Sequence, residues 1–288
     1  MGTVALRKYS NAPEHRNGKM IIDFHTHNFP DSIAERAMAT LIKNSFSKIN
    51  MTAHTNGTAS DAERHLRSFG IDRAVVCNIA TNTHQESKVN SYALSLLSRG
   101  DFFSPLGSVH PDSEKKAEEL NRLLGGGIRG IKLHADYAGI ELSDERYSEI
   151  FGLLEERKMF AVLHMGFDPV STEHVHATPN MLLPVIRRFP RLKLVAAHMG
   201  SFKMAKEVLS TIVGTNIYID TSLSSLRSDE TELLHTILRE HSPERILFGT
   251  DTPWSDPKEE IAFVENAPID EKRREMIFYK NAASLLFD

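Results

Sequence analysis

Short apolar runs alternate with longer amphipathic segments along most of the chain. Eight of the runs have the length and composition of β-strands, and they cover residues 20–24, 73–78, 103–109, 130–134, 160–164, 193–198, 216–220 and 246–251. Strands that alternate with helical segments are typical of repeated βα units and a parallel sheet. Because eight such units suit a closed barrel better than an open sheet, the pattern predicts a (β/α)8 TIM-like barrel.

The segments between these runs show the periodicity of amphipathic helices. We predict helices over residues 113–124, 147–157, 179–188 and 230–240. Two connections are longer than a simple crossover, one from residue 28 to about 66 and one over residues 165–179. Both follow strands, so we expect them at the carboxyl end of the barrel, where barrel enzymes place substrate-binding loops.

The length of 288 residues lies within the range of one barrel, and no shift in composition divides the chain. We therefore predict a single domain over residues 19–288, preceded by a flexible polar tail at residues 1–18. The hydrophobic fraction of 41% and the charged fraction of 25% are typical of soluble globular proteins.

The charge and the cysteine count narrow the choice of partners and compartment. A formal net charge of −4 argues against nucleic acid or an anionic membrane as the main partner, and no apolar stretch is long enough to span a bilayer. Cys77 is the single cysteine, so no intrachain disulfide is possible, which suits the cytoplasm. We expect a small-molecule substrate and, as the commonest oligomeric state, a homodimer.

Ionisable residues stand where the apolar runs end. His25 and His27 follow the first run, and the fourth, fifth, sixth and eighth runs end in His134, His164, His198 and Asp251. The carboxyl ends of parallel strands meet at one mouth of a barrel. Neutral imidazoles and a carboxylate are common ligands of zinc and similar ions. The sequence therefore predicts a divalent-metal site at this mouth.

The spacing of these residues supports the metal site but leaves several roles open. Residues i and i+2 of a strand face the same side, so His25 and His27 can bind one ion together. His198 is interpreted as a ligand, a catalytic base or a structural hydrogen-bonding group. Asp251 alternatively caps the turn that follows it. Lys132 shares a face with His134, and it either pairs with an acid, binds a substrate carboxylate or is carboxylated to bridge two metal ions.

Other residues that follow the predicted strands are candidates for substrate contact. They are His134, His110, Tyr137, Trp254 and Arg227, although Arg227 also fits an ordinary surface charge. Asp220 ends the seventh run, where it either supports the site or caps the next helix.

At these residues the chain resembles the amidohydrolase superfamily, in the amidohydrolase-related branch that also holds metal-dependent decarboxylases. The resemblance spans residues 21–287 and rests on four segments: Asp23-Phe-His-Thr-His27, Gly130-Ile-Lys-Leu-His134, residues 189–200 with the sequence FPRLKLVAAHMG, and residues 247–253 with the sequence LFGTDTP.

The resemblance implies a (β/α)8 barrel that binds one zinc-like ion. The implied ligands are His25, His27, His164 and Asp251, and His198 is implied to lie near the metal-bound water or the substrate. A second ion is an open alternative, with Lys132 and His198 as its candidate ligands.

From these residues we expect a metal-dependent hydrolase that activates water to cleave an amide, a lactone or a related carbonyl bond. Asp251 and His198 are the expected catalytic residues, and Asp251 is expected to move the proton. The closest alternative is a non-oxidative decarboxylase of a hydroxy-aromatic acid, because the same ligands serve both reactions. A phosphoesterase and a barrel that binds metal or ligand without catalysis are further alternatives.

Overall fold

The computed structural model describes residues 20–45, 52–169, 171 and 174–288. The tail expected at residues 1–18 lies outside the described residues. Eight strands follow one another along the chain: β1 (Ile22–Thr26), β2 (Arg73–Cys77), β3 (Phe103–Leu106), β4 (Gly130–Leu133), β5 (Phe160–Leu163), β6 (Leu194–Ala196), β7 (Tyr218–Asp220) and β8 (Ile246–Leu247).

All paired strands run parallel, in the order β1-β2-β3 and β4-β5-β6-β7-β8. Short parallel bridges join the two groups at both edges, one between Gly107 and Ile131 and one between Thr26 and Thr252. The amide of Phe24 also donates to the carbonyl of Phe248 across the second edge, at 2.7 Å. The strands therefore close into the cylinder that the sequence predicts.

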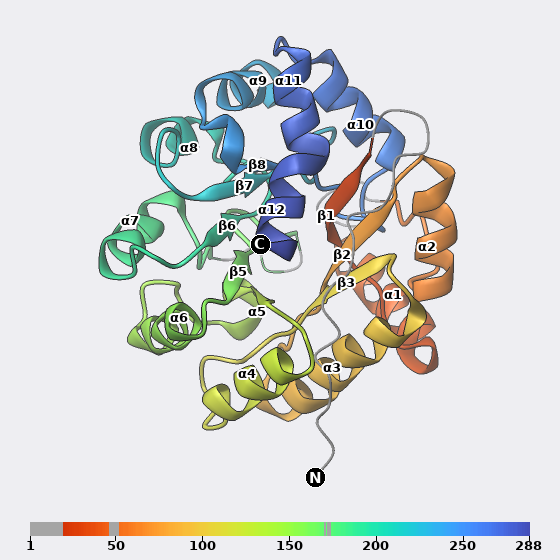
Figure 1. The fold of residues 1–288 in the computed structure, drawn as a ribbon, viewed down its shortest axis with the longest axis vertical. Coiled ribbons are helices and arrows are strands. Elements are labelled where there is room, and N and C mark those ends of the chain that lie inside the picture. Colours follow the sequence, from red (N-terminus) through yellow and green to blue (C-terminus); the bar gives the residue numbers. More distant parts are fainter. Residues whose placement is uncertain (1–19, 46–51, 170, 172–173) are drawn as a thin grey trace.

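Helices surround the strands, as expected of a (β/α)8 barrel (Figure 1). The α-helices are α1 (Asp31–Ser45), α2 (Ala59–Ser68), α3 (Thr83–Leu96), α4 (Lys116–Gly125), α5 (Ala135–Ala138), α6 (Glu145–Arg157), α7 (Pro179–Arg188), α8 (Ala205–Thr211), α9 (Thr231–Glu240), α10 (Pro257–Asn266), α11 (Glu271–Glu275) and α12 (Asn281–Phe287). Short 3-10 turns η1 (Leu97–Arg99), η2 (Ser228–Glu230) and η3 (Pro243–Arg245) and the π-helical turn η4 (Met276–Lys280) complete the described elements. None of the described helices is both long and apolar enough to cross a membrane.

Most strands end earlier than the apolar pattern predicts. The eighth run was expected to continue to Asp251, and the sixth to His198, but β8 ends at Leu247 and β6 at Ala196. Asp251 and His198 have φ angles of 69° and 60°, in the left-handed region that a strand does not use. Asp251 and His198 therefore stand just beyond the ladder, where the backbone turns over the barrel mouth. His25 was expected after the first strand but lies within β1, which continues to Thr26.

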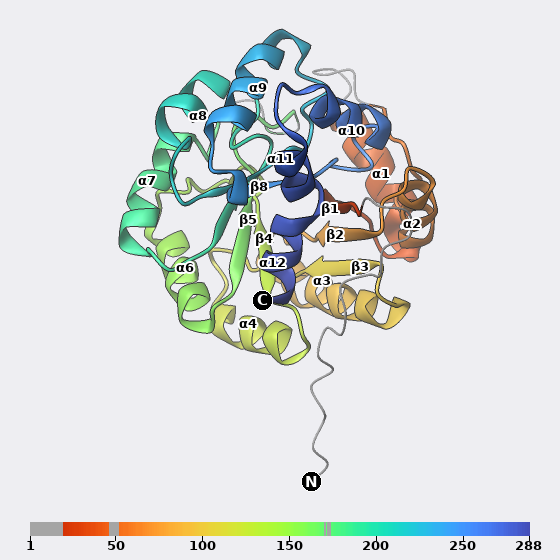
Figure 2. The same cartoon turned by 45° about the horizontal axis from the view of Figure 1, so that its top comes forward.

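The apolar residues form two clusters. The larger packs the outer faces of the strands against the surrounding helices. The smaller combines strand residues such as Phe24 and Val162 with Leu285 and Leu286 of α12. Figure 2 shows α12 beside the strands, near the end of the chain. This short helix covers the end of the barrel opposite the predicted metal ligands.

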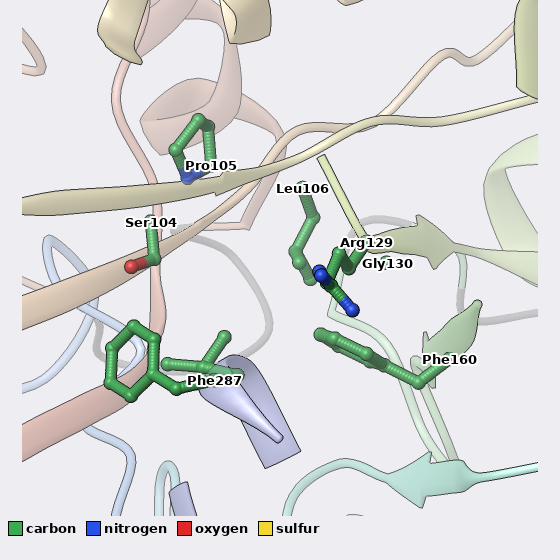
Figure 3. Close-up of a pocket in the computed structure, with 8 residues that line it drawn as sticks. Ser104, Pro105, Leu106, Arg129, Gly130, Phe160 and Phe287 are labelled. Carbon is green, nitrogen blue, oxygen red and sulfur yellow. The ribbon is translucent and has the colours of Figure 1, made fainter. Parts of the chain in front are cut away.

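A cavity at the covered end is too small for a ligand. A cavity of about 10 Å³, roughly the room of one water molecule, lies between the starts of β3, β4 and β5 and the end of α12. Figure 3 shows Phe160 near Gly130, and Phe287 on the other side of the cavity, near Ser104. A Cβ at Gly130 would lie 2.4 Å from the Phe160 ring, so a side chain here would displace the aromatic packing. The functional site therefore has to lie at the other end.

Glu260 of α10 ties this helix to the loop after β7. It accepts hydrogen bonds from the amide of Ser224 at 3.1 Å and from the hydroxyls of Ser225 and Ser255, both at 2.6 Å. Burial raises the pKa of Glu260 from 4.5 to about 8. The folded protein therefore keeps this proton at pH values where the unfolded chain has lost it.

We predict that Glu260 makes the protein less stable as the pH rises from 4.5 to about 8. In this window unfolding releases the Glu260 proton, so a higher pH favours the unfolded chain. Glu260→Gln removes the titration, and its melting temperature should change less with pH than that of the wild type. Thermal unfolding at several pH values measures the slope. The exposed neighbour Glu259→Gln is the control, and an unchanged slope in Glu260→Gln would contradict the prediction.

Candidate metal centre

Two imidazoles and one carboxylate converge at the mouth of the barrel. Nε2 of His27 lies 2.9 Å from Oδ1 of Asp251, and Nε2 of His25 lies 3.3 Å from the same oxygen. His25 comes from β1, His27 directly follows it, and Asp251 lies four residues beyond β8. The structure thus brings together three residues that the sequence predicts as ligands.

The contact between β1 and the segment after β8 holds these residues in register. The amide of Asp251 donates to the carbonyl of His25 at 2.7 Å, and the amide of His27 donates to the carbonyl of Thr252 at 2.6 Å. Gly249 permits this approach, because a Cβ there would lie 2.9 Å from the Cβ of His25. The positive φ of Asp251 then turns its side chain toward the two imidazoles.

Asp23 stabilises the same contact between β1 and the segment after β8. Its carboxyl accepts hydrogen bonds from the amide of His25 at 3.1 Å and from the amide and hydroxyl of Thr250 at 3.0 and 2.6 Å. Burial raises the pKa of Asp23 to about 7, so these donors hold a carboxyl group that is fully removed from water. Asp23 belongs to the support of the site.

The Nδ1 atoms of His25 and His27 each contact a hydrogen-bond acceptor of the protein. Nδ1 of His25 lies 2.9 Å from Oδ2 of Asp220, and Nδ1 of His27 lies 2.9 Å from the carbonyl oxygen of Cys77. A neutral imidazole that donates from Nδ1 has its lone pair on Nε2. Both lone pairs therefore point to the space beside Asp251, as ligands oriented by neighbouring groups do.

A second chain of hydrogen bonds starts from Asp220 and ends at His164. The hydroxyl of Ser222 donates to Asp220, Nδ1 of His198 lies 2.7 Å from this hydroxyl, and Nε2 of His198 lies 3.0 Å from Nδ1 of His164. Because the Ser222 hydroxyl donates to Asp220, Nδ1 of His198 donates to Ser222, and Nε2 of His198 accepts from Nδ1 of His164. Nδ1 of His164 therefore carries the proton, and its Nε2 carries the lone pair. Nε2 of His164 is buried and has no hydrogen-bond partner within the described residues. A buried imidazole nitrogen with a free lone pair is suited to bind a metal ion.

His164 also belongs to a second group of residues. The His134 and His164 rings stack at 3.9 Å, and Oδ2 of Asp168 lies 3.4 Å from Nε2 of His134 and 3.9 Å from Nε2 of His164. Nδ1 of His134 accepts from the amide of Tyr137 at 3.4 Å, so Nε2 of His134 is the donor toward Asp168. Asp168 was not predicted, although its place four residues after His164 is a usable signal.

The electrostatics of the site favour a cation. Burial lowers the pKa of His25, His134, His164 and His198 well below 6.5, so these imidazoles are neutral and able to act as ligands. Burial also raises the pKa of Asp251 above 3.8. Buried lone pairs beside a buried carboxylate are costly without a partner, and a divalent ion would supply one.

Lys132 adds a positive group to the same floor. It is fully buried on β4, and its Nζ lies 3.2 Å from Nε2 of His25. Within the described residues no ion pair with an acid is formed by Lys132, so the first of its three predicted roles has no support. Substrate binding and carboxylation stay predictions.

The metal-ligand candidates line one large cavity of about 570 Å³. His25, His27, His164 and Asp251 are among its lining residues, together with His198 and Lys132. Of the residues expected to contact substrate, three line the cavity, namely His134, Tyr137 and Trp254. The cavity volume lies within the range of about 300–1,000 Å³ of small-molecule sites.

Two residues expected at the substrate do not line this cavity. Nδ1 of His110 accepts from the amide of Asp112 at 3.2 Å, which places its ring in the loop after β3. Arg227 is fully buried and donates to the carbonyl of His198 at 3.0 Å and to Glu230 at 2.8 Å. The interpretation of Arg227 as a surface charge is wrong, because the arginine supports the turn that carries His198.

A match to a family model shows to which protein family the chain belongs. The model described as amidohydrolase matches residues 22–287. The chain belongs to the amidohydrolase family. It is therefore an enzyme of this family, a hydrolase or a decarboxylase, and no sequence among the curated proteins matches it.

Solved structures share this fold at low sequence identity. A TIM-barrel protein from Bordetella bronchiseptica aligns with a TM-score of 0.74 and 18% identity, covering 93% of this chain and 98% of that chain. A 2,6-dihydroxybenzoate decarboxylase from Rhizobium aligns with a TM-score of 0.70 and 16% identity, covering 93% and 99%. A dihydroxybenzoic acid decarboxylase from Polaromonas sp. JS666, solved with manganese and 2-nitroresorcinol, gives 0.70 and 16%, covering 93% and 97%.

The residues of the site fit a divalent metal ion as cofactor of this amidohydrolase-family enzyme. Ring nitrogens of His25, His27 and His164 and the carboxylate of Asp251 face one cavity, and Nε2 of His164 is buried without a hydrogen-bond partner within the described chain.

We predict that Asp220→Asn lowers the affinity for a divalent ion about 10- to 100-fold. Asp220 would not bind the ion, but its carboxylate orients His25 through Nδ1. Competition with a chromogenic chelator measures the affinity. Asp229→Asn, an exposed change on η2, is the control and should bind normally. Unchanged affinity in Asp220→Asn would mean that this contact does not orient the ligand.

We also predict that Arg227→Met destabilises the fold by about 1–3 kcal/mol, because the buried carbonyl of His198 keeps only the amide of Ser201 as donor and Glu230 loses its partner. Urea unfolding measures the change. Arg239→Met removes an exposed arginine and should change the free energy of unfolding by less than about 0.5 kcal/mol. Equal effects of the two substitutions would argue against the supporting role of Arg227.

Proposed function

We propose that this enzyme is a metal-dependent, non-oxidative decarboxylase of a small hydroxy-aromatic carboxylic acid. The supporting observation is a cavity whose floor holds the ligand cluster and whose walls are largely apolar. Phe29, Tyr137, Phe167 and Trp254 contribute aromatic surface to these walls. Aromatic rings pack well against such surface, while the polar floor suits a carboxylate.

The similar structures favour this reaction over hydrolysis. Those from Rhizobium and Polaromonas are named as decarboxylases of dihydroxybenzoic acids. Their identity to this chain is low, so they support the reaction class rather than a particular substrate. We expected a hydrolase first from the sequence, and the comparison gives the decarboxylase more support.

We propose one Zn²⁺ ion as the cofactor, held by His25, His27, His164 and Asp251, since imidazoles with one carboxylate suit zinc. When bound, the ion would hold substrate oxygens and stabilise the negative charge that develops on them. Manganese is an alternative, because the Polaromonas structure contains it. Elemental analysis of the purified protein distinguishes the two metals and counts the ions.

The protein side chains would then move one proton. The bond between the ring carbon and the carboxylate breaks, carbon dioxide leaves, and the ring carbon keeps the electron pair and takes a proton. Asp251 is the proposed donor of this proton, because its carboxyl group lines the cavity beside His25 and His27. His198 lines the cavity, but its two ring nitrogens are engaged by Ser222 and His164, so we propose that it orients His164.

Hydrolysis of an amide or a lactone is the second candidate. The matching family model is described as amidohydrolase, and the same ligand cluster suits activation of water. In that reaction Asp251 would take a proton from water and pass it to the leaving group. Product analysis separates the candidates, because only decarboxylation releases carbon dioxide from an aromatic acid.

We predict that the metal-loaded protein releases carbon dioxide from at least one hydroxybenzoic acid, and that Asp251→Asn lowers this rate about 10²- to 10⁴-fold. The panel contains dihydroxybenzoic acids beside amides and lactones, with carbon dioxide measured by a coupled assay. Asp229→Asn is the control with the same change of charge. Turnover of a lactone or an amide without carbon dioxide release would decide for hydrolysis, and a near-normal rate in Asp251→Asn would refute the proton donor.

A further inference from the structure

Leu223, in the loop after β7, has a backbone conformation that leucine rarely adopts. Its φ angle is 59°, in the left-handed region where the Cβ of an L-residue is crowded. The residue is only 5% exposed, and its side chain lines the cavity above the candidate metal centre. A strained residue persists only where the surrounding structure imposes its conformation. The loop must therefore hold Leu223 in place against this strain.

Positive φ angles gather at the mouth of the barrel. Within the described residues, six residues other than glycine have a positive φ, and five of them follow β6, β7 or β8. Three of the six line the cavity, namely His198, Leu223 and Asp251. His198 and Asp251 already belong to the metal centre. Because strained residues cluster at functional sites, Leu223 is a candidate for a role in the same site.

The side chain of Leu223 takes no part in the hydrophobic core. It is buried, yet it belongs to neither of the two apolar clusters that the described residues form. Met199 gives the contrast, because this buried residue also has a positive φ but packs into the larger cluster. The strain at Met199 thus serves the core, whereas Leu223 adds apolar surface to the cavity.

Hydrogen bonds on both sides of Leu223 fix the loop. Before it, the amide of Ser222 donates to the carboxylate of Asp220 at 3.2 Å. After it, the amide of Ser224 donates to the carboxyl group of Glu260 at 3.1 Å. The first contact belongs to the network that orients the imidazoles, and the second ties the loop to α10. Leu223 is therefore held between the metal centre and a helix of the barrel.

The neighbouring contacts place Leu223 close to the floor of the cavity. The hydroxyl of Ser222 lies 2.7 Å from Nδ1 of His198 and 3.3 Å from Nδ1 of His25. Leu223 is the next residue along the chain, so its side chain enters the cavity beside the floor rather than at the solvent end. A ring held at the floor by its carboxylate has this apolar side chain within reach.

We propose that Leu223 is a specificity-determining residue, which packs against the ring of an aromatic acid and limits the width of the cavity above the floor. This inference deepens the proposed function and rests on it in one respect, since it takes an aromatic acid as the ligand. The strained backbone is the means by which the loop presents an apolar side chain to that ring. A shorter side chain at this position opens room for a wider ring system.

The test compares the binding of benzoate and 1-naphthoate to the metal-loaded protein by isothermal titration calorimetry. Neither acid carries the hydroxyl group of the proposed substrate class. Leu223→Ala should bind benzoate about tenfold more weakly, because the contact between the leucine and the ring is lost. The wider 1-naphthoate fills the space that is opened, so the ratio of the naphthoate affinity to the benzoate affinity should rise about tenfold.

A second variant tests the strain itself. Leu223→Gly removes the same side chain, but glycine adopts the left-handed conformation without a steric cost. It should show the same ratio of affinities as Leu223→Ala and melt at a higher temperature, although glycine at most positions is less stabilising than alanine. A lower melting temperature of Leu223→Gly would show that the backbone is not strained, and the proposal would fail.

Leu226→Ala is the matched control, because Leu226 lies in the same loop, is 43% exposed and does not line the cavity. It should keep the wild-type ratio of affinities. Leu223→Ala should hold the divalent ion within about twofold of the wild type, whereas a merely structural role would weaken the metal and both acids together. An unchanged ratio in Leu223→Ala, an equal change in Leu226→Ala, or no binding of either acid to the wild type would each overturn the proposal.

Failure of this proposal and failure of the proposed reaction give different results. If the ratio of affinities changes in Leu223→Ala while no hydroxybenzoic acid releases carbon dioxide, the leucine contacts an aromatic ring and the proposed reaction is wrong. If carbon dioxide is released but the ratio does not change, the reaction stands and Leu223 does not determine specificity. Binding is measured without turnover, so neither result depends on the other.

Discussion

The pairing of β1 with the segment after β8 is the constraint on which the site depends. Two backbone hydrogen bonds, from the amide of Asp251 to His25 and from the amide of His27 to Thr252, bring together residues more than 220 positions apart. These bonds form only when the barrel closes, so the fold and the ligand cluster are completed by the same contact. Asp23 stabilises this contact by accepting a hydrogen bond from the hydroxyl of Thr250. Gly249 leaves room for the side chain of His25.

A network centred on Asp220 extends this arrangement to the sixth and fifth strands. Its carboxylate contacts His25 directly and reaches His164 through Ser222 and His198. Such a network sets which nitrogen of each imidazole carries the proton, and this choice decides which lone pairs face the cavity. The buried Arg227 adds a bond to the carbonyl of His198, where the backbone adopts a left-handed conformation. Orientation of the imidazoles is thus a property of the whole mouth of the barrel.

The cavity above this floor divides into two chemically different parts. Its floor carries neutral imidazoles, a carboxylate and Lys132, whereas its outer wall carries Arg36 and Lys88 beside apolar surface. Reaction and recognition can therefore be separated in space, as in other barrel enzymes whose loops change while the strand ends keep their chemistry. The residues of α1 and α3 that line the cavity belong to this outer part.

The sequence by itself determined the eight βα units and the polar residues at their ends, because both the periodicity and the burial of strands are local properties. It also placed His25, His27 and Asp251 in one cluster, since parallel strands share one mouth. Only the tertiary structure decided that Arg227 is buried, that His110 does not line the cavity, and that Asp168 joins His134 and His164. These facts depend on how each loop leaves its strand and on which side chains it meets across the barrel. Sequence spacing does not fix the contact of Arg227 with His198 or that of Asp168 with His134, because these partners lie far apart in the chain.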